Sequence, residues 1–357
     1  MSISKNKGEW SELYAFLKIL GEKNIRTSVS SSKYAEFTKL IRECKGKKII
    51  YEIESPYSNI KIKVLSDEFI FEGSKLRKIL PEIFKKIKYG EGRSFQLGNE
   101  FWQELKTLKI GDIRFSRDRK SDFYGVLQDP LRKTETEELG FSVKSKIGGS
   151  ATLLNAGKTT NFVYLIAGIK DQKEKEEINS IKGKSKIKDR IKKLIDNKYE
   201  IKFHKTEKDI FEKNLRMIDS LLPEIISDML KIYYSGKATK VKEIIEKILK
   251  EESFSNRFKF LEKEMLEFKI KNFLEAVALG MVPGKLWDGF FLAKGGCLIV
   301  EDDGELVCYY MYNRDELRKY LYENTRFESP SSERHCYGKI YEKCGSFYIN
   351  LNLQIRF

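Results

Sequence analysis

The chain lacks the long apolar segments of membrane proteins and the cysteine patterns of disulfide-rich or zinc-binding proteins. No stretch approaches the roughly 18 uninterrupted apolar residues that a membrane-spanning helix needs. The 5 cysteines are scattered and form no Cys-x-x-Cys pair, so we expect reduced thiols. The N-terminus, MSISKNKGEWSE, has no apolar signal core. Together these absences predict a cytoplasmic protein with no membrane partner.

Two common catalytic signatures are also missing. Only 2 histidines occur, His204 and His335, which disfavours nuclease chemistry built on several imidazoles, such as an HNH site. The segment AGKTT (156–160) resembles part of a phosphate-binding loop. However, position 152 is threonine where that motif requires glycine, and the following NFVYLIAGI has the pattern of a strand. A nucleotide-binding loop needs a helix there, so we do not expect one.

What the chain has in excess is positive charge. Its 357 residues include 68 Lys and Arg against 53 Asp and Glu, a net charge of +15. Such a field favours polyanions, of which nucleic acid is the commonest in the cytoplasm. A lysine-rich proteome would produce the same composition, so charge alone does not decide. The hydrophobic content of 41% is enough for a core, and the length predicts two domains or one large domain with an appendage.

The order of apolar patterns predicts an α+β (mixed α/β) fold with a central mixed sheet flanked by helices. Residues 170–280 are predominantly helical in pattern and highly charged. Other helices are expected at 6–23, 74–89, 98–107 and 314–323. Strands are expected at 48–55, 59–66 and 68–73, which would form a small antiparallel sheet of their own, and at 122–129, 140–147 and 161–169, with hairpins at 295–312 and 335–357.

A lysine stands where the second of two neighbouring strands should be buried. The strand GFSVKSKI would place Phe141 and Val143 on one face, and Ser142 and Lys144 on the other. The preceding strand begins with Asp122. An acid on one strand and Ser-x-Lys on its neighbour resembles the PD-(D/E)xK nuclease pattern. Phosphodiester hydrolysis needs a carboxylate to bind Mg²⁺ and a cation beside the attacking water. A surface ion pair would give the same pattern.

A second acid is needed, because one carboxylate is usually too few to hold the metal. In the first helix, Glu9 falls roughly 80° from the centre of the apolar stripe at Leu17, and Glu12 about 140° from it. We therefore expect Glu9 at the edge of the buried face and Glu12 mostly facing water. Glu9 could instead serve the helix dipole. Asp129 is expected in a turn before Pro130, but could replace Asp122 if the register slips.

Three blocks of sequence resemble the HpaII family of type II restriction endonucleases. They are NKGEWSELYAFLKIL at the start, KSDF with LGFSVKSKIGGSATLLNAGKTTNFVYL in the middle, and RHCYGKIY with LNLQIRF at the end. The resemblance implies a bacterial, Mg²⁺-dependent endonuclease on a PD-(D/E)xK core. It would cut double-stranded DNA at a short palindrome, which is CCGG for the family's namesake, and leave 5′-phosphate ends. It also implies a cognate methyltransferase acting on the same site, and a homodimer is possible. Asp122, Ser142, Lys144 and Glu9 are the predicted catalytic residues, with Asp122 and Glu9 as metal ligands.

Two polar segments are the predicted DNA contacts. The stretch GGSATLLNAGKTTN follows the predicted catalytic strand directly, and SPSSERHCYG (329–338) should form an exposed loop before a hairpin. Arginine is the commonest reader of guanine, which makes Arg334 the predicted base contact. The basic segment 182–205, expected to be helical, could add phosphate contacts or be a solvated face. The predicted DNA-contacting residues are Lys146, Asn155, Lys158, Ser332, Arg334 and His335.

The predicted domains are residues 1–110, which would contact DNA, and residues 111–357, which would hold the catalytic core with a helical insertion at about 170–285 and a C-terminal β/α recognition region. The Glu9 helix should pack on that core. Two rival functions fit the same residues. One is a structure-selective repair nuclease that uses the same strands, and the other is a basic DNA-binding protein without catalytic activity.

Overall fold

The chain folds into two compact units, each made from two segments. A computed structural model describes residues 4–28, 33–44, 46–110 and 121–357. The first unit comprises residues 1–151 and 291–317, and the second comprises residues 152–290 and 318–357. Each unit combines helices with β-sheet, so the predicted α+β class is confirmed. In the described residues, no helix has both the length and the apolar character needed to cross a membrane.

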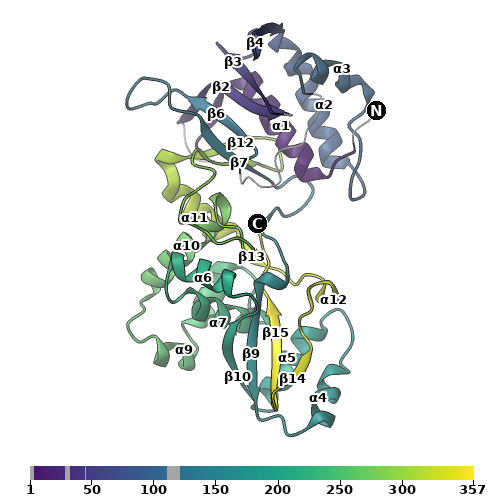
Figure 1. Cartoon of the computed structure of the whole chain (residues 1–357), viewed down its shortest axis with the longest axis vertical. Helices are drawn as coiled ribbons and strands as arrows, with labels where there is room; N and C mark the ends of the chain where they lie inside the picture. Colours follow the sequence, from purple (N-terminus) through teal and green to yellow (C-terminus); the bar gives the residue numbers. More distant parts are fainter. Residues whose placement is uncertain (1–3, 29–32, 45, 111–120) are drawn as a thin grey trace. The chain divides into compact units, whose positions relative to one another are not determined.

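The first unit is built on a nine-stranded mixed sheet (Figure 1). Its strand order is β1-β12-β11-β7-β6-β2-β3-β4-β5. The pairs β11–β7 and β1–β12 are parallel and the others antiparallel. The strands are β1 (Asn24–Arg26), β2 (Tyr34–Cys44), β3 (Lys47–Ile53), β4 (Ile60–Val64), β5 (Asp67–Phe71), β6 (Phe123–Leu127), β7 (Leu139–Ser145), β11 (Gly296–Val300) and β12 (Leu306–Tyr310).

Six of these strands close on themselves. The short strand β1 pairs with β12 through Arg26 and Val307, and it also pairs with β2. The series β1, β12, β11, β7, β6 and β2 is therefore a ring, and β3 to β5 extend from β2. The three-stranded antiparallel region expected near residues 48–73 exists, but it continues this sheet instead of forming a separate one.

The first helix, α1 (Lys7–Glu22), lies against this ring and is buried on most of its surface. It contacts β1, β2, β7 and β11 and also α2 (Leu76–Tyr89). An unbroken run from Leu13 to Gly21 is buried, which covers all directions of a helix. Asn6 caps the helix by accepting the N–H of Glu9 at 2.9 Å. Helix α3 (Asn99–Thr107) completes the unit, and the helices expected at 74–89 and 98–107 are confirmed.

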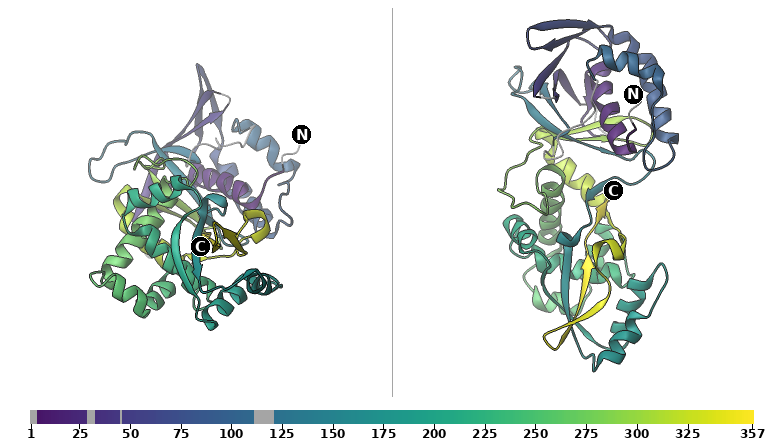
Figure 2. Two further views of the ribbon diagram at one scale, coloured as in Figure 1. Left: turned by 60° about the horizontal axis from the view of Figure 1, so that its bottom comes forward. Right: turned by 45° about the vertical axis from the view of Figure 1, so that its right-hand side comes forward.

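The second unit carries an antiparallel sheet in the order β10-β9-β15-β14. Strand β9 (Asn161–Ala167) and β15 (Ser346–Asn352) are far apart in sequence yet pair along nearly their whole length (Figure 2). The outer strands are β10 (Glu200–Thr206) and β14 (Ile340–Lys343), and a small sheet joins β8 (Thr152–Leu154), β16 (Ile355–Arg356) and β13 (Arg326–Phe327). The helices are α4 (Gln172–Asn179), α5 (Lys186–Asp196), α6 (Asp209–Ile218), α7 (Leu222–Tyr234), α8 (Val241–Ile248), α9 (Glu252–Arg257), α10 (Lys263–Leu279), α12 (Ser332–His335) and α11 (Arg314–Asn324), whose first turn belongs to the first unit.

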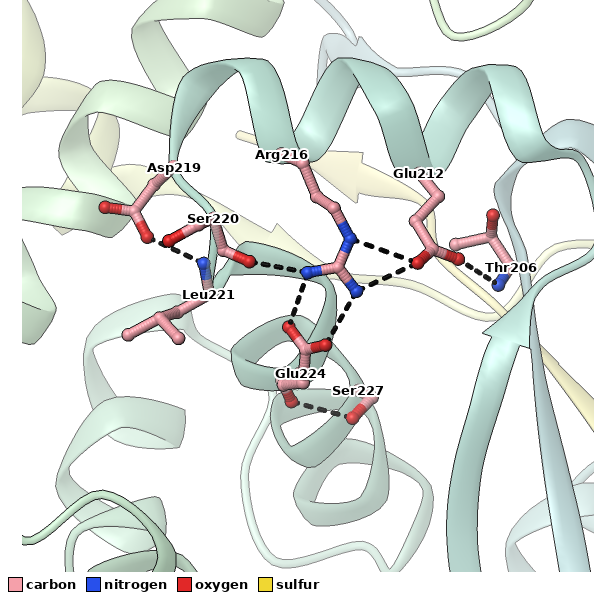
Figure 3. Close-up of polar contacts among 8 residues, drawn as sticks. All are labelled: Thr206, Glu212, Arg216, Asp219, Ser220, Leu221, Glu224 and Ser227. Carbon is pink, nitrogen blue, oxygen red and sulfur yellow. Dashed lines mark hydrogen bonds and ion pairs between the residues drawn. The ribbon is translucent and has the colours of Figure 1, made fainter.

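Arg216 fastens the corner between α6 and α7 (Figure 3). Its guanidinium donates to Glu212 Oε1 at 2.9 Å, to Glu224 Oε1 at 2.7 Å and to the carbonyl oxygen of Ser220 at 2.7 Å. Glu212 also accepts the N–H of Thr206, the last residue of β10, at 3.2 Å. One cation thus ties the two helices to the end of a strand.

Two predictions of local structure are wrong, and one strand was not predicted. Residues 200–206 were expected to be helical, but they form β10 because their apolar residues alternate and pair with β9. The loop expected at 329–338 contains the short helix α12, which the Ser331 side chain caps. No strand was expected at 34–44, where β2 joins the ring to β3. The strand pair β6–β7, the hairpins β11–β12 and β14–β15, and helix α11 are confirmed.

Candidate active site

A glycine fixes the start of β6 beside β7. A Cβ atom on Gly140 would lie 2.2 Å from Ser121 Oγ, closer than atoms can approach. Ser121 is buried there and donates its hydroxyl to the carbonyl oxygen of Leu292 at 2.9 Å. The N–H of Asp122 then donates to the carbonyl oxygen of Phe141 at 2.7 Å. Asp122 is thereby anchored at the point where β6 begins.

The predicted acid and the predicted lysine lie together in the structure. Asp122 Oδ2 accepts the main-chain N–H of Val143 at 2.6 Å. Lys144 Nζ donates to Ser142 Oγ at 2.8 Å and to the carbonyl oxygen of Val143 at 3.0 Å. Ser142 is buried, whereas Asp122 and Lys144 are half-buried and open to solvent. A carboxylate, a hydroxyl and an ammonium group therefore gather around one residue of β7.

Glu12 brings a second carboxylate to this group. It projects from α1, which packs against β7, and it is half-buried. Burial and the nearby negative charge of Asp122 raise the pKa of Glu12 from 4.5 to about 8, while the positive charge of Lys144 acts in the opposite direction. The expectation that Glu12 mostly faces water is wrong, because α1 has protein around most of its surface.

Glu9 has a structural partner on each side. Its side chain accepts the N–H of Asn6 at 3.1 Å, which completes the N-terminal capping box, and pairs with Lys5 Nζ at 2.8 Å. Its charge also contributes to raising the pKa of Glu12. A catalytic or metal-binding role for Glu9 stays a prediction.

Asp129 occupies the turn that was expected before Pro130. Its Oδ1 accepts the N–H groups of Leu131 at 2.9 Å and Arg132 at 3.0 Å, and its Oδ2 accepts the hydroxyl of Tyr312 at 2.7 Å. These hydrogen bonds lower the pKa of Asp129. The carboxylate oxygens of Asp129 therefore accept hydrogen bonds that stabilise this turn, whereas that of Asp122 accepts a hydrogen bond from β7.

The predicted DNA-contacting residues divide between the two units. Lys146, in the first unit, pairs with Glu301 at 2.7 Å. In the second unit, Asn155, Lys158 and Arg334 are exposed, while Ser332 and His335 are half-buried. Burial, and then the charge of Arg334, lower the pKa of His335. The turn Lys158–Thr160 leads directly into β9, as expected for a segment that is not a nucleotide-binding loop.

The donor set at Glu12 and Asp122 is suited to a hard cation. Burial and the charge of Asp122 raise the pKa of Glu12, so it is unfavourable for both carboxylates to be ionised together, and a divalent ion would offset that cost. In the parts of the chain that are described, no group of three or more His, Cys, Asp or Glu side chains is arranged to hold a metal. A bound ion would need water or substrate oxygens to complete its shell, as is usual for Mg²⁺.

Comparison with known proteins gives matches over essentially the whole chain. A family model described as HpaII restriction endonuclease matches residues 6–357. The type II restriction enzyme HpaII of Haemophilus parainfluenzae is 37% identical over 361 residues, which cover 99% of this chain and 98% of that protein. No solved structure gives a significant match.

Proposed function

The chain belongs to the HpaII family of type II restriction endonucleases, and on this premise we propose that Glu12, Asp122 and Lys144 form its catalytic site. The enzyme is a site-specific deoxyribonuclease whose substrate is DNA. The observation that carries the proposal is that Asp122 and Lys144 both hydrogen-bond to the main chain of Val143 in β7, against which the Glu12 helix α1 packs. Burial and Asp122 raise the pKa of Glu12 to about 8, and Lys144 opposes them. We further propose that β6 and β7 correspond to the two strands of a PD-(D/E)xK core.

In this proposal the carboxylates of Asp122 and Glu12 hold Mg²⁺, and Glu9 remains a candidate for a further ligand or a water contact. When bound, the ion would withdraw charge from the phosphoryl oxygens. Lys144 orients the attacking water and stabilises negative charge that develops on the phosphate. Ser142, whose hydroxyl receives the hydrogen bond of Lys144, holds that ammonium group in place.

The finer properties follow as proposals from family membership. The enzyme cuts double-stranded DNA at a short palindrome, for which CCGG is the first sequence to test, and leaves 5′-phosphate ends. A cognate methyltransferase protects the same site, and the working unit is a homodimer. Residues 1–110 contribute contacts to DNA, and Arg334 reads a guanine with Ser332, His335, Asn155 and Lys158 nearby in the same unit. Lys146, which directly follows β7, contributes a further contact to DNA.

The decisive experiment is cleavage of plasmid DNA of known sequence, with Mg²⁺ or with EDTA, followed by mapping of the cut ends. Discrete fragments that appear only with Mg²⁺ and share one short sequence are expected. A basic binding protein would give no products in either tube. A structure-selective nuclease would cut mismatched or branched duplexes regardless of sequence, and either outcome would reject the proposal.

A further inference from the structure

The sheet β10-β9-β15-β14 has one covered face and one open face. On the covered face, Tyr164 donates its hydroxyl to the carbonyl oxygen of Ser227 in α7 at 2.8 Å. Phe162, two residues before it, meets Phe211 of α6 edge-on, with ring centroids 6.1 Å apart. Both residues of β9 are fully buried. Because side chains alternate along a strand, the residues between them point to the other side.

A row of four residues crosses the other face. Tyr341 pairs with Tyr348, Tyr348 with Leu165, and Leu165 with Lys202, so the four side chains lie in register across β14, β15, β9 and β10. The two tyrosine rings are stacked, with centroids 5.8 Å apart and an angle of 24°. Tyr341, Leu165 and Tyr348 are half-buried, and Lys202 is exposed. This side therefore presents a half-buried aromatic pair to solvent, whereas Val163 and Asn350 on the same side are buried.

A β-bulge gathers basic groups on the same side. Phe203 pairs with Tyr164 and Lys205 with Val163, so His204 is an extra residue between two ladder pairs. In a regular strand the side chains of Lys202 and Lys205 would point to opposite faces of the sheet. The bulge turns Lys205 to the open face, the same face as Lys202. The ring of His204 lies 5.7 Å from that of Tyr348, on this face too. Lys202, His204 and Lys205 are all exposed.

Positive charge prevails on this face. Lys343 follows Tyr341 by two residues, so it also points to the open side, and it is exposed. Two acids lie on or beside this face: Glu200 pairs with Lys202 at 2.8 Å, and Glu207 accepts the side-chain amide of Asn350 at 3.2 Å, so three lysines face two carboxylates. The lysines flank the tyrosine pair from both edges of the sheet. The open face is defined below as Lys202, His204, Lys205, Tyr341, Lys343 and Tyr348.

Buried asparagines connect one end of this sheet to the predicted DNA-contacting segments. Asn161 donates to the carbonyl oxygen of His335 at 2.9 Å, and Asn352 donates to the carbonyl oxygen of Gly157 at 2.8 Å. Asn352 also donates to Asn161 Oδ1 at 2.6 Å, and both side chains are buried. The segments that carry Lys158 and Arg334 are thus held together at the end of β9 and β15.

We propose that the open face binds the phosphate backbone of the substrate duplex, next to the segments of Lys158 and Arg334. This inference rests on the proposed function and adds a surface to it. Lys202, Lys205 and Lys343 provide phosphate contacts, and the hydroxyl-bearing rings of Tyr341 and Tyr348 pack against sugar and phosphate. A second copy of this chain would bring lysines against lysines, which makes a polyanion the better electrostatic partner.

The test compares the double variant Lys202→Ala/Lys205→Ala with Lys242→Ala/Lys247→Ala, which removes two exposed lysines from α8. Binding to duplex DNA that contains the cleavage site is measured in EDTA at several salt concentrations. The first variant should lose roughly tenfold or more in affinity. The slope of log K against log salt should fall by about 2, since each phosphate contact contributes about 0.9. The control variant should match the wild type in both.

Unchanged affinity and salt slope in the first variant would overturn this inference. So would a change only in the oligomeric state measured by sedimentation, because the face would then join two copies. Melting temperatures of both variants should equal that of the wild type, since the lysines are exposed. Cleavage by the wild type is measured in parallel with Mg²⁺. If the wild type cuts no DNA while its salt slope still differs from that of Lys202→Ala/Lys205→Ala, the catalytic proposal fails and the binding surface stands.

Discussion

Asp122 and Lys144 are held by the same residue, Val143, one through its N–H at 2.6 Å and the other through its carbonyl oxygen at 3.0 Å. The spacing of acid and amine is therefore set by the main chain of β7. Main-chain atoms survive substitution of either side chain. Each group can consequently be replaced without displacing the other, which makes single variants informative.

Lys144→Ala should lower the rate of DNA cleavage by at least roughly 100-fold while DNA binding persists, because a cation beside the phosphate is lost. The measurement is single-turnover cleavage together with binding in EDTA. Lys48→Ala is the matched control, because Lys48 pairs with Glu138 on the surface of the same unit. Undiminished cleavage by Lys144→Ala would reject the site.

Asp122→Asn and Asp129→Asn should have opposite effects. In Asp122→Asn, the amide oxygen can still accept the N–H of Val143 but supplies no charge to a cation, so cleavage should be lost with little change in melting temperature. Asp129→Asn replaces a carboxylate that accepts three hydrogen bonds in a turn, so that variant should be less stable and still cut. If Asp129→Asn is inactive although folded, Asp129 belongs to the site.

Glu12→Gln should change how stability depends on pH in EDTA. The pKa of Glu12 is about 8 in the folded protein and near 4.5 in the unfolded chain. Between these values the folded protein retains a proton that the unfolded chain has released, so this group's contribution to stability falls as pH rises and is lost above about 8. Glutamine has no such dependence. The melting temperature of the variant should therefore exceed that of the wild type at pH 9 and approach it near pH 4. Parallel curves would contradict the raised pKa.

Arg334→Ala should weaken binding to the cognate duplex by about 1–3 kcal/mol, roughly 5- to 150-fold. Binding to a non-cognate duplex of equal length is the internal control. A base-reading arginine would bring the two affinities closer together. Equal weakening of both would identify a phosphate contact instead.

Arg216→Met should destabilise the second unit by about 1 kcal/mol, because the hydrogen bonds at the α6–α7 corner are lost and Glu212 and Glu224 then repel each other. Thermal unfolding measures this. Lys213→Met, at an exposed position on the same helix, is the control and should leave the melting temperature unchanged.

Sequence patterns located the acid and lysine of β6 and β7 because alternation is a local property of a strand. They misplaced Glu12 because the helical wheel assumes one buried face, whereas α1 is covered by strands and by α2. An acid in a helix with apolar residues on every side was the available signal. Similarly, the strand β10 was predicted as helix because of its lysines. These side chains alternate with Ile201 and Phe203, but a helix-rich neighbourhood made the charges look like a helical surface.

The division of the chain into two units, each built from distant segments, follows from long-range pairing. Strand β11 joins β7 across more than a hundred residues, and β15 joins β9 in the same way. The sequence of a single strand does not indicate which strand it will pair with, because pairing depends on the packing of the whole sheet.

The closed ring of strands also determines how strand β7 can unfold. An open sheet can lose its outermost strand while the rest stays folded, but β7 has a neighbour on each side in a circle. If the ring opens at the pairing of Arg26 with Val307, β7 still lies between β11 and β6, so its main-chain amides reach solvent only after those two pairings are lost as well. In hydrogen–deuterium exchange, β1 should therefore label first, and β7 should label together with the unfolding of the whole unit.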